Sequence, residues 1–256
     1  MTLFDLSGKV AIITGSTKGI GKAIAEEMSA HGAKVVITSR KAETCDQVAE
    51  FICDKGGDAI AIPCNISHKA QLEALVAKTH KFYGRIDILV CNAALNPYFG
   101  SALDIPDSAF EKIMAANIMS NHWLIQMVAT DMIKRKDGAI IIVSSIGGFR
   151  GSETLGAYCI SKAADMQMAR NMAMELGPHN IRVNCIAPGL VKTDFARALW
   201  EDPVRHNLRV EQTPLKRLGE PRDIAGLAVY MASEAGAWTT GQTVVVDGGI
   251  TSVGEG

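Results

Sequence analysis

The sequence predicts a single α/β domain, a doubly wound sandwich of about seven parallel strands with helices on both faces. Three observations lead to this prediction. Short continuous apolar runs recur along the 256 residues, as they do in strands that are buried on both faces. Stretches of helical periodicity separate these runs, which is the pattern of repeated βαβ units. A glycine-rich turn follows the first run, where folds of this class bind phosphate groups.

The elements follow from these patterns in chain order. The predicted strands cover residues 10–13, 35–38, 59–62, 86–91, 139–144, 181–186 and 243–246. Helical segments lie between them, at 21–31, 71–83 and 109–134 among others. The least regular long segment, about 191–217, contains Pro203 and Pro214 and precedes the last helix and strand. Long connections in compact α/β domains usually serve function, so we expect a substrate lid there, within one domain spanning 1–256.

Two helices carry more apolar surface than one sheet-facing stripe requires, since their apolar residues lie on nearly all sides. The residues are Ile113, Met114, Ile118, Met119, Trp123, Ile125, Val128 and Ile133 on the first helix, and Met166, Met168, Met172 and Met174 on the second. These side chains would either fill a deep monomer core or meet another subunit. We favour a subunit interface.

The bulk composition excludes several classes of protein. Lys and Arg total 26 against 27 for Asp and Glu, so neither a nucleic-acid surface nor a membrane surface is expected. No apolar run approaches the length of a membrane span. The six cysteines form no Cys-x-x-Cys pair and the six histidines no metal-ligand spacing, so we expect reduced thiols, no metal site and a cytoplasmic protein.

The glycine-rich turn has the spacing Gly-x-x-x-Gly-x-Gly, between a strand ending at Thr14 and the next helix. Such a turn places a helix N-terminus and backbone N–H groups against the pyrophosphate of a dinucleotide, as in Rossmann-like folds. Alone it would often be an ordinary tight connection, but its position in a βαβ unit favours cofactor binding. The predicted cofactor contacts here are Gly15, Thr17, Lys18, Gly19, Ile20 and Gly21.

The end of the second strand should lie over the adenosine ribose of that cofactor. An acidic residue there would bind the 2′-hydroxyl of NAD, whereas an Arg would accept the 2′-phosphate of NADP. Ser39 and Arg40 occupy this place, and no carboxylate does. With Lys18 in the first turn, two cations can converge on a phosphate, unless both are merely solvated surface charges. The sequence therefore favours NADP(H).

Tyr158 and Lys162 stand four residues apart on a predicted helix, so a phenol and an ammonium share one face. A nearby Lys⁺ and a nicotinamide cation would lower the pKa of the phenol from about 10, so that it can donate or accept a proton. Ser145, at the end of the preceding strand, can hydrogen-bond the same substrate oxygen. Asn117, in an otherwise apolar helix, is a candidate anchor for a water leading to Lys162. Together these residues predict hydride transfer to a carbonyl.

With these motifs, the chain resembles the short-chain dehydrogenase/reductase family along nearly its whole length, from Gly8 to Gly249. The resemblance implies a catalytic tetrad of Asn117, Ser145, Tyr158 and Lys162, with Lys162 also holding the nicotinamide ribose. It implies cofactor contacts from these further residues: Asn65, Ile66, Asn92, Ala93, Ala94, Pro188, Gly189, Val191 and Thr193. Two positions depart from the family pattern, because Ala94 replaces the usual Gly and Asn65 the usual Asp beside the adenine.

Within the family, the chain is similar to NADPH-dependent tetrameric carbonyl reductases, which implies a homotetramer acting on a small carbonyl or alcohol. The candidate substrate pocket is apolar and aromatic, which suits a hydrophobic carbonyl compound, although the same residues could be lid packing. These residues are Tyr98, Phe99, Ile146, Phe149, Phe195, Leu199 and Trp200.

Three other functions stay open. One is a 3-oxoacyl thioester reductase, for which Lys192, Arg197, Arg205 and Arg209 would offer a basic patch to an acidic carrier. Another is an NAD-dependent secondary alcohol dehydrogenase. The third is a nucleotide-binding regulator without catalysis, which the presence of both Tyr158 and Lys162 disfavours.

Overall fold

The computed structural model describes residues 2–252 and contains one sheet of seven parallel strands in the order β3-β2-β1-β4-β5-β6-β7. The predicted fold class is confirmed. Each strand lies within about two residues of its expected range because each apolar run is buried as a unit. The strands are β1 Val10–Thr14, β2 Lys34–Thr38, β3 Asp58–Ala61, β4 Ile88–Cys91, β5 Gly138–Val143, β6 Ile181–Pro188 and β7 Thr243–Val246.

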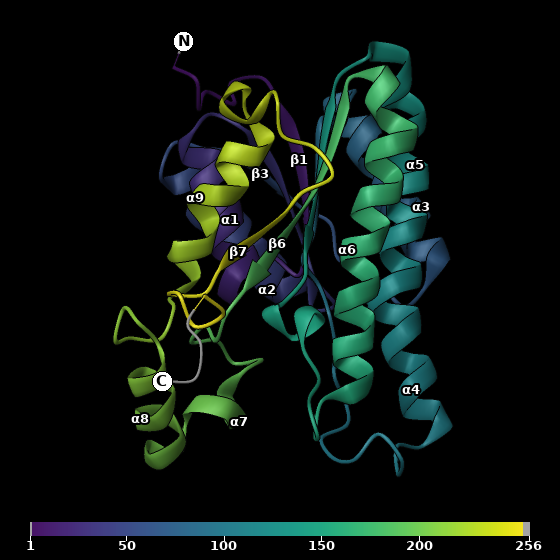
Figure 1. Ribbon diagram of the computed structural model, residues 1–256. Helices are drawn as coiled ribbons and strands as arrows, with labels where there is room; N and C mark the ends of the chain where they lie inside the picture. The colour runs from purple at the N-terminus through teal and green to yellow at the C-terminus, as the bar shows by residue number, and fades with distance from the viewer. Residues whose placement is uncertain (1, 253–256) are drawn as a thin grey trace.

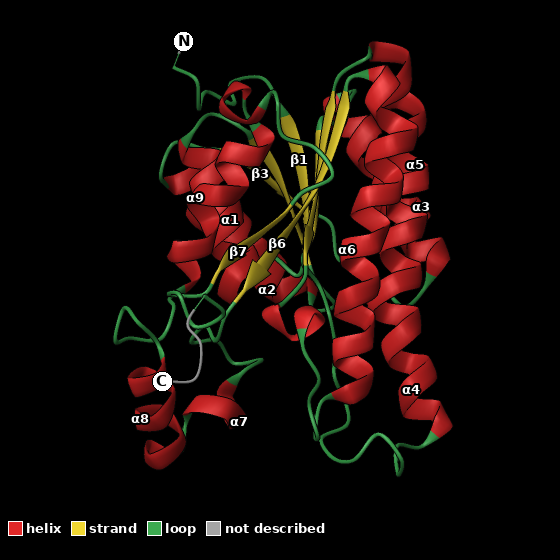
Figure 2. Ribbon diagram, viewed as in Figure 1, coloured by secondary structure: helices red, strands yellow, loops and turns green. Residues whose placement is uncertain are grey.

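Helices cover both faces of the sheet, so the molecule has three layers (Figure 1). One apolar core lies under α1, α2 and α9, and the other under α3, α5 and α6. Figure 2 shows the strands edge-on between these two sets of helices. The principal helices are α1 Gly19–Ala30, α2 Ala42–Asp54, α3 Lys69–Tyr83, α5 Ser120–Arg135, α6 Gly156–Leu176 and α9 Pro221–Ala232.

The strand order reverses between β1 and β4, because the chain leaves the β3 edge and returns to the centre of the sheet. The register pairs Ala11 with Ile88 and Ile13 with Val90 across this point. Loops after the carboxyl ends of strands diverge on either side of such a reversal, and ligands bind in the space between them. The glycine-rich turn after β1 and the Asn92 loop after β4 both begin there.

Two expectations about regular structure need correction. The helix expected at 109–134 is divided into α4 Asp107–Met114, a π-helical turn Ala115–Met119 and α5. The lid expected to be irregular contains the short helices α7 Arg197–Trp200 and α8 Pro203–Gln212. Pro203 starts α8 at the first helical position, where a missing N–H costs nothing, and Asp202 caps it by accepting from the Arg205 N–H. Proline therefore marked a helix start there.

Packing within the monomer buries only part of the apolar surface on the two helices described above. Ile113, Ile125, Val128 and Met166 are buried. Met119 is 41% exposed and Met174 81% exposed, both on helices that pack on the same face of the sheet. Within residues 2–252, no helix is long and apolar enough to cross a membrane.

Candidate active site

The glycine-rich turn after β1 excludes side chains at three positions, Gly15, Gly19 and Gly21. Gly15 and Gly19 have φ of +67° and +55°, which L side chains rarely adopt. A Cβ on Gly19 would lie 3.1 Å from the Thr193 methyl carbon, and one on Gly21 would lie 2.4 Å from the Gly15 carbonyl oxygen. The helix α1 begins at Gly19, so its free N–H groups point toward this turn. The site therefore fits a dinucleotide pyrophosphate.

The side chains of Thr14, at the end of β1, and Asn92, directly after β4, hold this turn in place by hydrogen bonds. The Asn92 side-chain amide donates to the Thr14 carbonyl at 2.8 Å and to the Gly15 carbonyl at 3.3 Å. The Thr14 hydroxyl accepts from the backbone N–H groups of Asn92 and Ala93 at 2.9 and 3.0 Å. Asn92 thus joins the β1 and β4 loops across the strand-order reversal. Ala94 is half-buried in the same loop.

Because Gly21 packs against both Asn92 and the Gly15 carbonyl, Gly21→Ala is expected to destabilise the fold and weaken cofactor binding together. The added Cβ would stand 2.4 Å from the Asn92 amide nitrogen, so the turn must shift. Overpacking of this kind costs about 1–3 kcal/mol. Thermal unfolding and cofactor titration measure the two effects. Gly226→Ala is the matched control, since a Cβ there meets no atom within 4 Å; equal unfolding temperatures for both variants would contradict this account.

The residues expected near the adenosine ribose lie at the end of β2, beside the glycine-rich turn. The Ser16 N–H donates to the Thr38 carbonyl at 3.1 Å, and the Ser16 hydroxyl accepts from the Thr38 N–H at 2.9 Å. Ser39 follows at once, half-buried, with its hydroxyl 3.4 Å from the Cys45 sulfur. Arg40 is exposed next to it. Arg40 is therefore an exposed cation at the end of β2, beside the glycine-rich turn.

Lys18 does not extend toward Arg40 in this structure. Its ammonium lies 3.3 Å from the Asp194 carboxylate, and Arg197 contacts the same carboxylate at 2.8 Å. This exposed contact joins the glycine-rich turn to the start of the lid. Exposed ion pairs contribute about 0–1 kcal/mol, so Lys18 is readily drawn to a more highly charged partner.

Two further sets of expected cofactor contacts border the same space. The Asn65 side chain accepts from the Ser67 N–H at 3.2 Å, and Ile66 packs against the core under α3. Val191 is buried and pairs with Gly219 in an isolated parallel bridge, while the Thr193 hydroxyl accepts from the Ala196 N–H at 3.3 Å. Gly189, which follows Pro188 at the end of β6, has no room for a side chain, because a Cβ there would lie 2.7 Å from Asp247 Cβ.

Ser145 and the helix α6 bring the proposed chemistry together beyond β5. The Ser145 hydroxyl accepts from the Gly147 N–H at 3.0 Å, which starts the 3₁₀ turn Ile146–Phe149. Tyr158 lies in the first turn of α6, partly accessible to solvent. The Lys162 ammonium is 5.7 Å from the centre of the Tyr158 ring. The structure therefore places Ser145, Tyr158 and Lys162 in one group.

Lys162 is held from two sides in the buried core of this group. Its ammonium donates to the Val143 carbonyl at 2.9 Å and to the Asp165 carboxylate at 2.9 Å. Asp165 also accepts from the Asn121 side-chain amide at 3.0 Å. Asp165 is fully buried and was not expected from the sequence as part of the site. Its position three residues after Lys162, on the same helical face, was the available signal.

Asn117 lies in the π-helical turn, a distortion that often accompanies functional residues. Its side-chain amide donates to the Ser161 hydroxyl at 3.0 Å and to the Leu95 carbonyl at 3.1 Å. Its side-chain oxygen accepts from the Leu95 N–H at 2.9 Å. The side chain thus joins the Asn92 loop to α6. Its backbone carbonyl accepts from the Asn121 side-chain amide at 2.7 Å, and its role as a water anchor stays a prediction.

The expected lowering of the Tyr158 pKa combines Lys162 with a nicotinamide cation, and the protein alone shows only the first of these effects. Burial raises the pKa of the phenol, and the opposing effects of Lys162 and Ser145 do not overcome it in the protein alone. Burial would lower the pKa of Lys162, but the adjacent Asp165 carboxylate raises it above its usual value, so the amine stays protonated. Burial raises the pKa of Asp165 as well, against Lys162 and Asn121. Lys162 and the Asn121 amide both donate hydrogen bonds to Asp165, so Asp165 is the carboxylate of an ion pair with Lys162.

The segment expected to form a lid contacts this group through Phe195. The Phe195 ring lies 6.0 Å from the Tyr158 ring, centre to centre, and is itself 55% exposed. The Trp200 indole donates to the Thr193 carbonyl at 3.1 Å, which folds α7 back over the lid's base. Tyr98, by contrast, donates to the Ser101 carbonyl at 3.2 Å within its own loop.

The remaining pocket candidates differ in burial. Phe99 and Phe149 are about half exposed, Leu199 is half-buried and Ile146 is buried. Of the expected pocket residues, the structure brings Phe195 against Tyr158 and places Ile146 directly after Ser145. Among the described residues, no contact joins Tyr98 to Tyr158.

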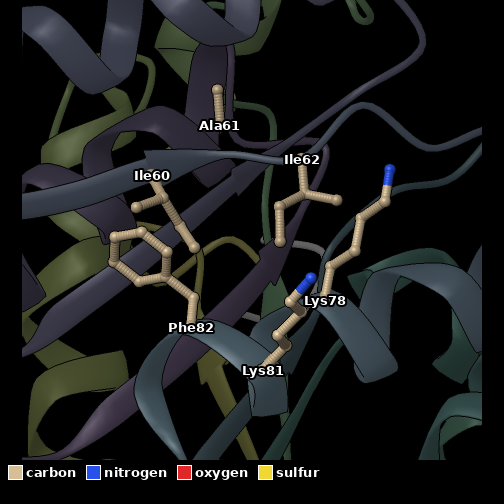
Figure 3. A pocket seen from close by; sticks show the side chains of 6 residues that line it. All are labelled: Ile60, Ala61, Ile62, Lys78, Lys81 and Phe82. Atoms are coloured by element: carbon tan, nitrogen blue, oxygen red, sulfur yellow. The ribbon is translucent and has the colours of Figure 1, made fainter.

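A separate hollow lies at the β3 edge of the sheet (Figure 3). It is lined by Ile60, Ala61, Ile62, Lys78, Lys81 and Phe82. Its wall is apolar apart from two lysines, and the hollow shares no residue with the Tyr158 group or with the glycine-rich turn. We therefore place the candidate active site at Tyr158. Among residues 2–252, no group of three His, Cys, Asp or Glu side chains could hold a metal ion.

Comparisons with known proteins agree with this geometry. A family model described as enoyl-(acyl carrier protein) reductase matches residues 15–251. Dehydrogenase/reductase SDR family member 4 of Homo sapiens is 42% identical over 247 residues, which cover 96% of this chain and 89% of the human protein. Tropinone reductase-like 3 of Erythroxylum coca is 38% identical over 245 residues, covering 96% and 94%.

Two solved structures of similar proteins carry different cofactors. A 7α-hydroxysteroid dehydrogenase in complex with NADH and 7-oxo glycochenodeoxycholic acid superimposes with a TM-score of 0.93 at 37% identity, covering 96% of both chains. A gluconate 5-dehydrogenase from Burkholderia cenocepacia, in complex with NADP and tartrate, gives 0.94 at 31% identity over 98% of both chains.

A parallel sheet with a glycine-rich turn at its strand-order reversal, and a tyrosine beside a buried lysine, defines a nicotinamide-dependent oxidoreductase. The extent of the sequence matches makes the assignment narrower. The chain belongs to the short-chain dehydrogenase/reductase family.

Proposed function

We propose that the protein is an NADP(H)-dependent oxidoreductase that interconverts a hydrophobic or aromatic ketone or aldehyde and the corresponding alcohol. The observation that supports this most directly is the group formed by Ser145, Tyr158 and Lys162, with the phenol 5.7 Å from a fixed ammonium. A phenol, a hydroxyl and a cation around one opening are the parts that proton transfer to a carbonyl oxygen requires.

The cofactor supplies the hydride when it is bound. The protein's own residues bind and orient the reactants and move the proton. Gly15, Gly19 and Gly21 leave room for the pyrophosphate, and Lys162 offers a donor to the nicotinamide ribose. Ser145 positions the substrate oxygen by a hydrogen bond, and the Tyr158 hydroxyl gives its proton to that oxygen. Since burial raises the pKa of Tyr158, the phenol is protonated and ready to act as the acid in carbonyl reduction.

The preference for NADP(H) rests on charges rather than on relatives, because similar solved structures hold either NADH or NADP. Arg40 is exposed directly after the half-buried Ser39, and neither side chain is a carboxylate that would repel a 2′-phosphate. Lys18 can add a second cation if it leaves Asp194. The runner-up, an NAD-dependent alcohol dehydrogenase, would leave these cations without a role.

The apolar lid favours a hydrophobic substrate. The Phe195 ring lies 6.0 Å from the Tyr158 ring, centre to centre, so the lid presents carbon surface beside the proton donor. The cations proposed for an acidic carrier lie in exposed ion pairs as weak as that of Lys18, so charge alone does not exclude the thioester alternative: Lys192 lies 3.4 Å from Glu220, and Arg197 lies 2.8 Å from Asp194. Turnover of 3-oxoacyl thioesters therefore decides this alternative.

The test is NADPH oxidation measured across aromatic ketones, α-dicarbonyls, 7-oxo steroids, sugars and 3-oxoacyl thioesters. We expect the highest kcat/KM with an aromatic or polycyclic ketone. Turnover confined to 3-oxoacyl thioesters would establish the alternative reductase. Absence of turnover with every class, together with tight NADPH binding, would favour a regulator that binds the nucleotide.

We also propose a homotetramer, with α5 and α6 forming one of its two-fold interfaces. Met174 and Ile160 are exposed on α6, Ile160 at 53%, and Met119 is exposed at the end of the π-helical turn that precedes α5. A second apolar region is available where Trp238, fully exposed, precedes the edge strand β7. Sedimentation velocity at micromolar concentration should show a tetramer, and Met174→Glu should shift it toward dimers by burying a charge. A monomer with full activity at that concentration would show that these side chains serve no interface.

A further inference from the structure

The Lys162–Asp165 ion pair is the most buried in the described part of the chain. Its side chains are 3% and 0% exposed, whereas Arg85 beside the buried Asp87 remains 40% exposed. Burying two opposite charges costs more in lost hydration than a hydrophobic replacement would, so such a pair is poor evidence of a stabilising role. An apolar side chain at position 165 would suit the core, which is formed by residues such as Met166 and Ala169 around it. The presence of a buried carboxylate at position 165 therefore needs an explanation other than stabilisation of the fold.

The geometry around the Lys162 ammonium gives one. An ammonium has three N–H donors. One donates to the Val143 carbonyl on β5 at 2.9 Å, and a second to the Asp165 carboxylate at 2.9 Å. These two fixed acceptors set the direction of the third N–H. That donor is the one left for a ribose hydroxyl or for the electrostatic field at Tyr158.

Asp165 is itself held in place. The Asn121 amide from α5 donates to its other oxygen at 3.0 Å, and the same amide donates to the Asn117 carbonyl at 2.7 Å. A chain of contacts thus runs from the π-helical turn through Asn121 and Asp165 to Lys162. Every group facing the carboxylate along this chain is a donor, which suits the charged form.

We propose that Asp165 is a positioning residue, which keeps Lys162 ionised and aims its remaining N–H at the cofactor and at Tyr158. This inference rests on the proposed function, since it assigns a role within the same site. Asp165 touches neither substrate nor cofactor, and it acts only through Lys162. Removal of its charge should therefore change how Tyr158 and Lys162 bind protons as well as how fast the enzyme works.

The direction of that change follows from Coulomb's law. A nearby carboxylate favours protonation of the phenol and of the amine, so its loss lowers both pKa values. The other titratable groups facing the cluster are Cys159 on α6, Cys91 on β4 and Cys185 on β6. Burial raises the pKa of all three thiols, so they stay neutral and do not replace the missing charge.

The experiment compares Asp165→Asn and Asp165→Ser, which remove the charge, with Asp165→Glu, which keeps it. For NADPH-dependent reduction, the pH above which kcat falls should move down by about one to two units in the neutral variants. The KM for NADPH should rise in both. The Glu variant should keep the wild-type pH dependence even if its kcat is lower. Two neutral variants of different size keep the test available if one of them fails to fold.

Asp87→Asn is the matched control. Asp87 is also a buried, ion-paired carboxylate, but it precedes β4 at the opposite end of the sheet from the site. This variant should lower the unfolding temperature and leave the pH dependence of kcat unchanged. If the neutral Asp165 variants behaved in the same way, with lower stability and an unshifted profile, Asp165 would be a structural residue and the proposal would be overturned.

A second readout needs neither substrate nor cofactor. The tyrosinate absorption of Tyr158 can be titrated in the wild type and in Asp165→Asn, with the matching Tyr158→Phe protein subtracted in each case. The phenol should ionise at lower pH in the Asp165→Asn background. This shift in a protein that reduced no carbonyl compound would support the electrostatic role while rejecting the proposed function. A wild-type enzyme that reduces carbonyl compounds, together with an unshifted Tyr158 pKa in Asp165→Asn, would support the proposed function and reject the electrostatic role of Asp165.

Discussion

Tyr158→Phe is expected to lower kcat for carbonyl reduction by at least about a hundredfold, and by several orders of magnitude if no water replaces the acid. The substitution removes the hydroxyl that protonates the carbonyl oxygen and leaves the ring that packs 6.0 Å from Phe195. Cofactor binding should stay nearly intact, since Lys162 keeps its contacts with Val143 and Asp165. Steady-state kinetics with NADPH titration by fluorescence separates the two effects.

Tyr230→Phe is the matched control for this variant. The Tyr230 hydroxyl lies 2.8 Å from the Thr239 hydroxyl, in the part of the molecule near α9 and β7. The control loses a hydroxyl and a hydrogen bond without touching the site, so kcat should hardly change. Retention of more than about a tenth of wild-type kcat by Tyr158→Phe would show that another group donates the proton.

Lys162→Ala differs from Tyr158→Phe in its expected signature. It should raise the KM for the cofactor and lower kcat together, and it leaves Asp165 as a buried charge without its cation. Such a loss is strongly destabilising, so its effect on activity must be read at a temperature well below its unfolding transition.

The fold could be predicted from the sequence because burial on both faces leaves a local mark. A run such as Val35 to Ile37 has no polar position, and only a strand covered on both sides tolerates that. The order of the strands could not be read in this way, since apolar runs carry no information about their neighbours. The π-helical turn around Asn117 was also missed, because the apolar residues of that segment lie on nearly all sides and leave no stripe whose shift would reveal an extra residue.

The site residues also differ in whether a local sequence pattern reveals them. Gly15, Gly19 and Gly21 are recognisable because a close backbone approach admits only glycine, and Tyr158 and Lys162 because a fixed spacing places them on one helical face. Asp194 and Asn121 were not recognisable, since their partners lie far along the chain or in another helix. The direction of the Tyr158 pKa also needed the structure, because burial outweighs a neighbour that the sequence does show.

The preference for NADPH over NADH is expected to be about ten- to a hundredfold in kcat/KM from Arg40 alone. A charge-assisted hydrogen bond contributes about 1.5–3 kcal/mol, and NADH offers only a hydroxyl in place of the phosphate. Lys18 should add less than Arg40, because it must first leave Asp194, although an exposed pair of this kind is worth only about 0–1 kcal/mol. Asp194→Asn should therefore free Lys18 and increase the preference slightly.

Arg40→Ala should remove most of this preference by raising the KM for NADPH, with little change in the KM for NADH. Ser39→Asp should reverse the preference, because a carboxylate would repel the 2′-phosphate and accept a hydrogen bond from the NAD ribose. Lys41→Ala is the matched control, since Lys41 is an exposed neighbouring cation one residue further along the chain. Equal kcat/KM for the two cofactors in the wild-type enzyme would show that Arg40 and Lys18 are solvated surface charges. Equal losses in Arg40→Ala and Lys41→Ala would instead indicate a diffuse positive field, because a forked hydrogen bond to a phosphate depends on one guanidinium and a field does not.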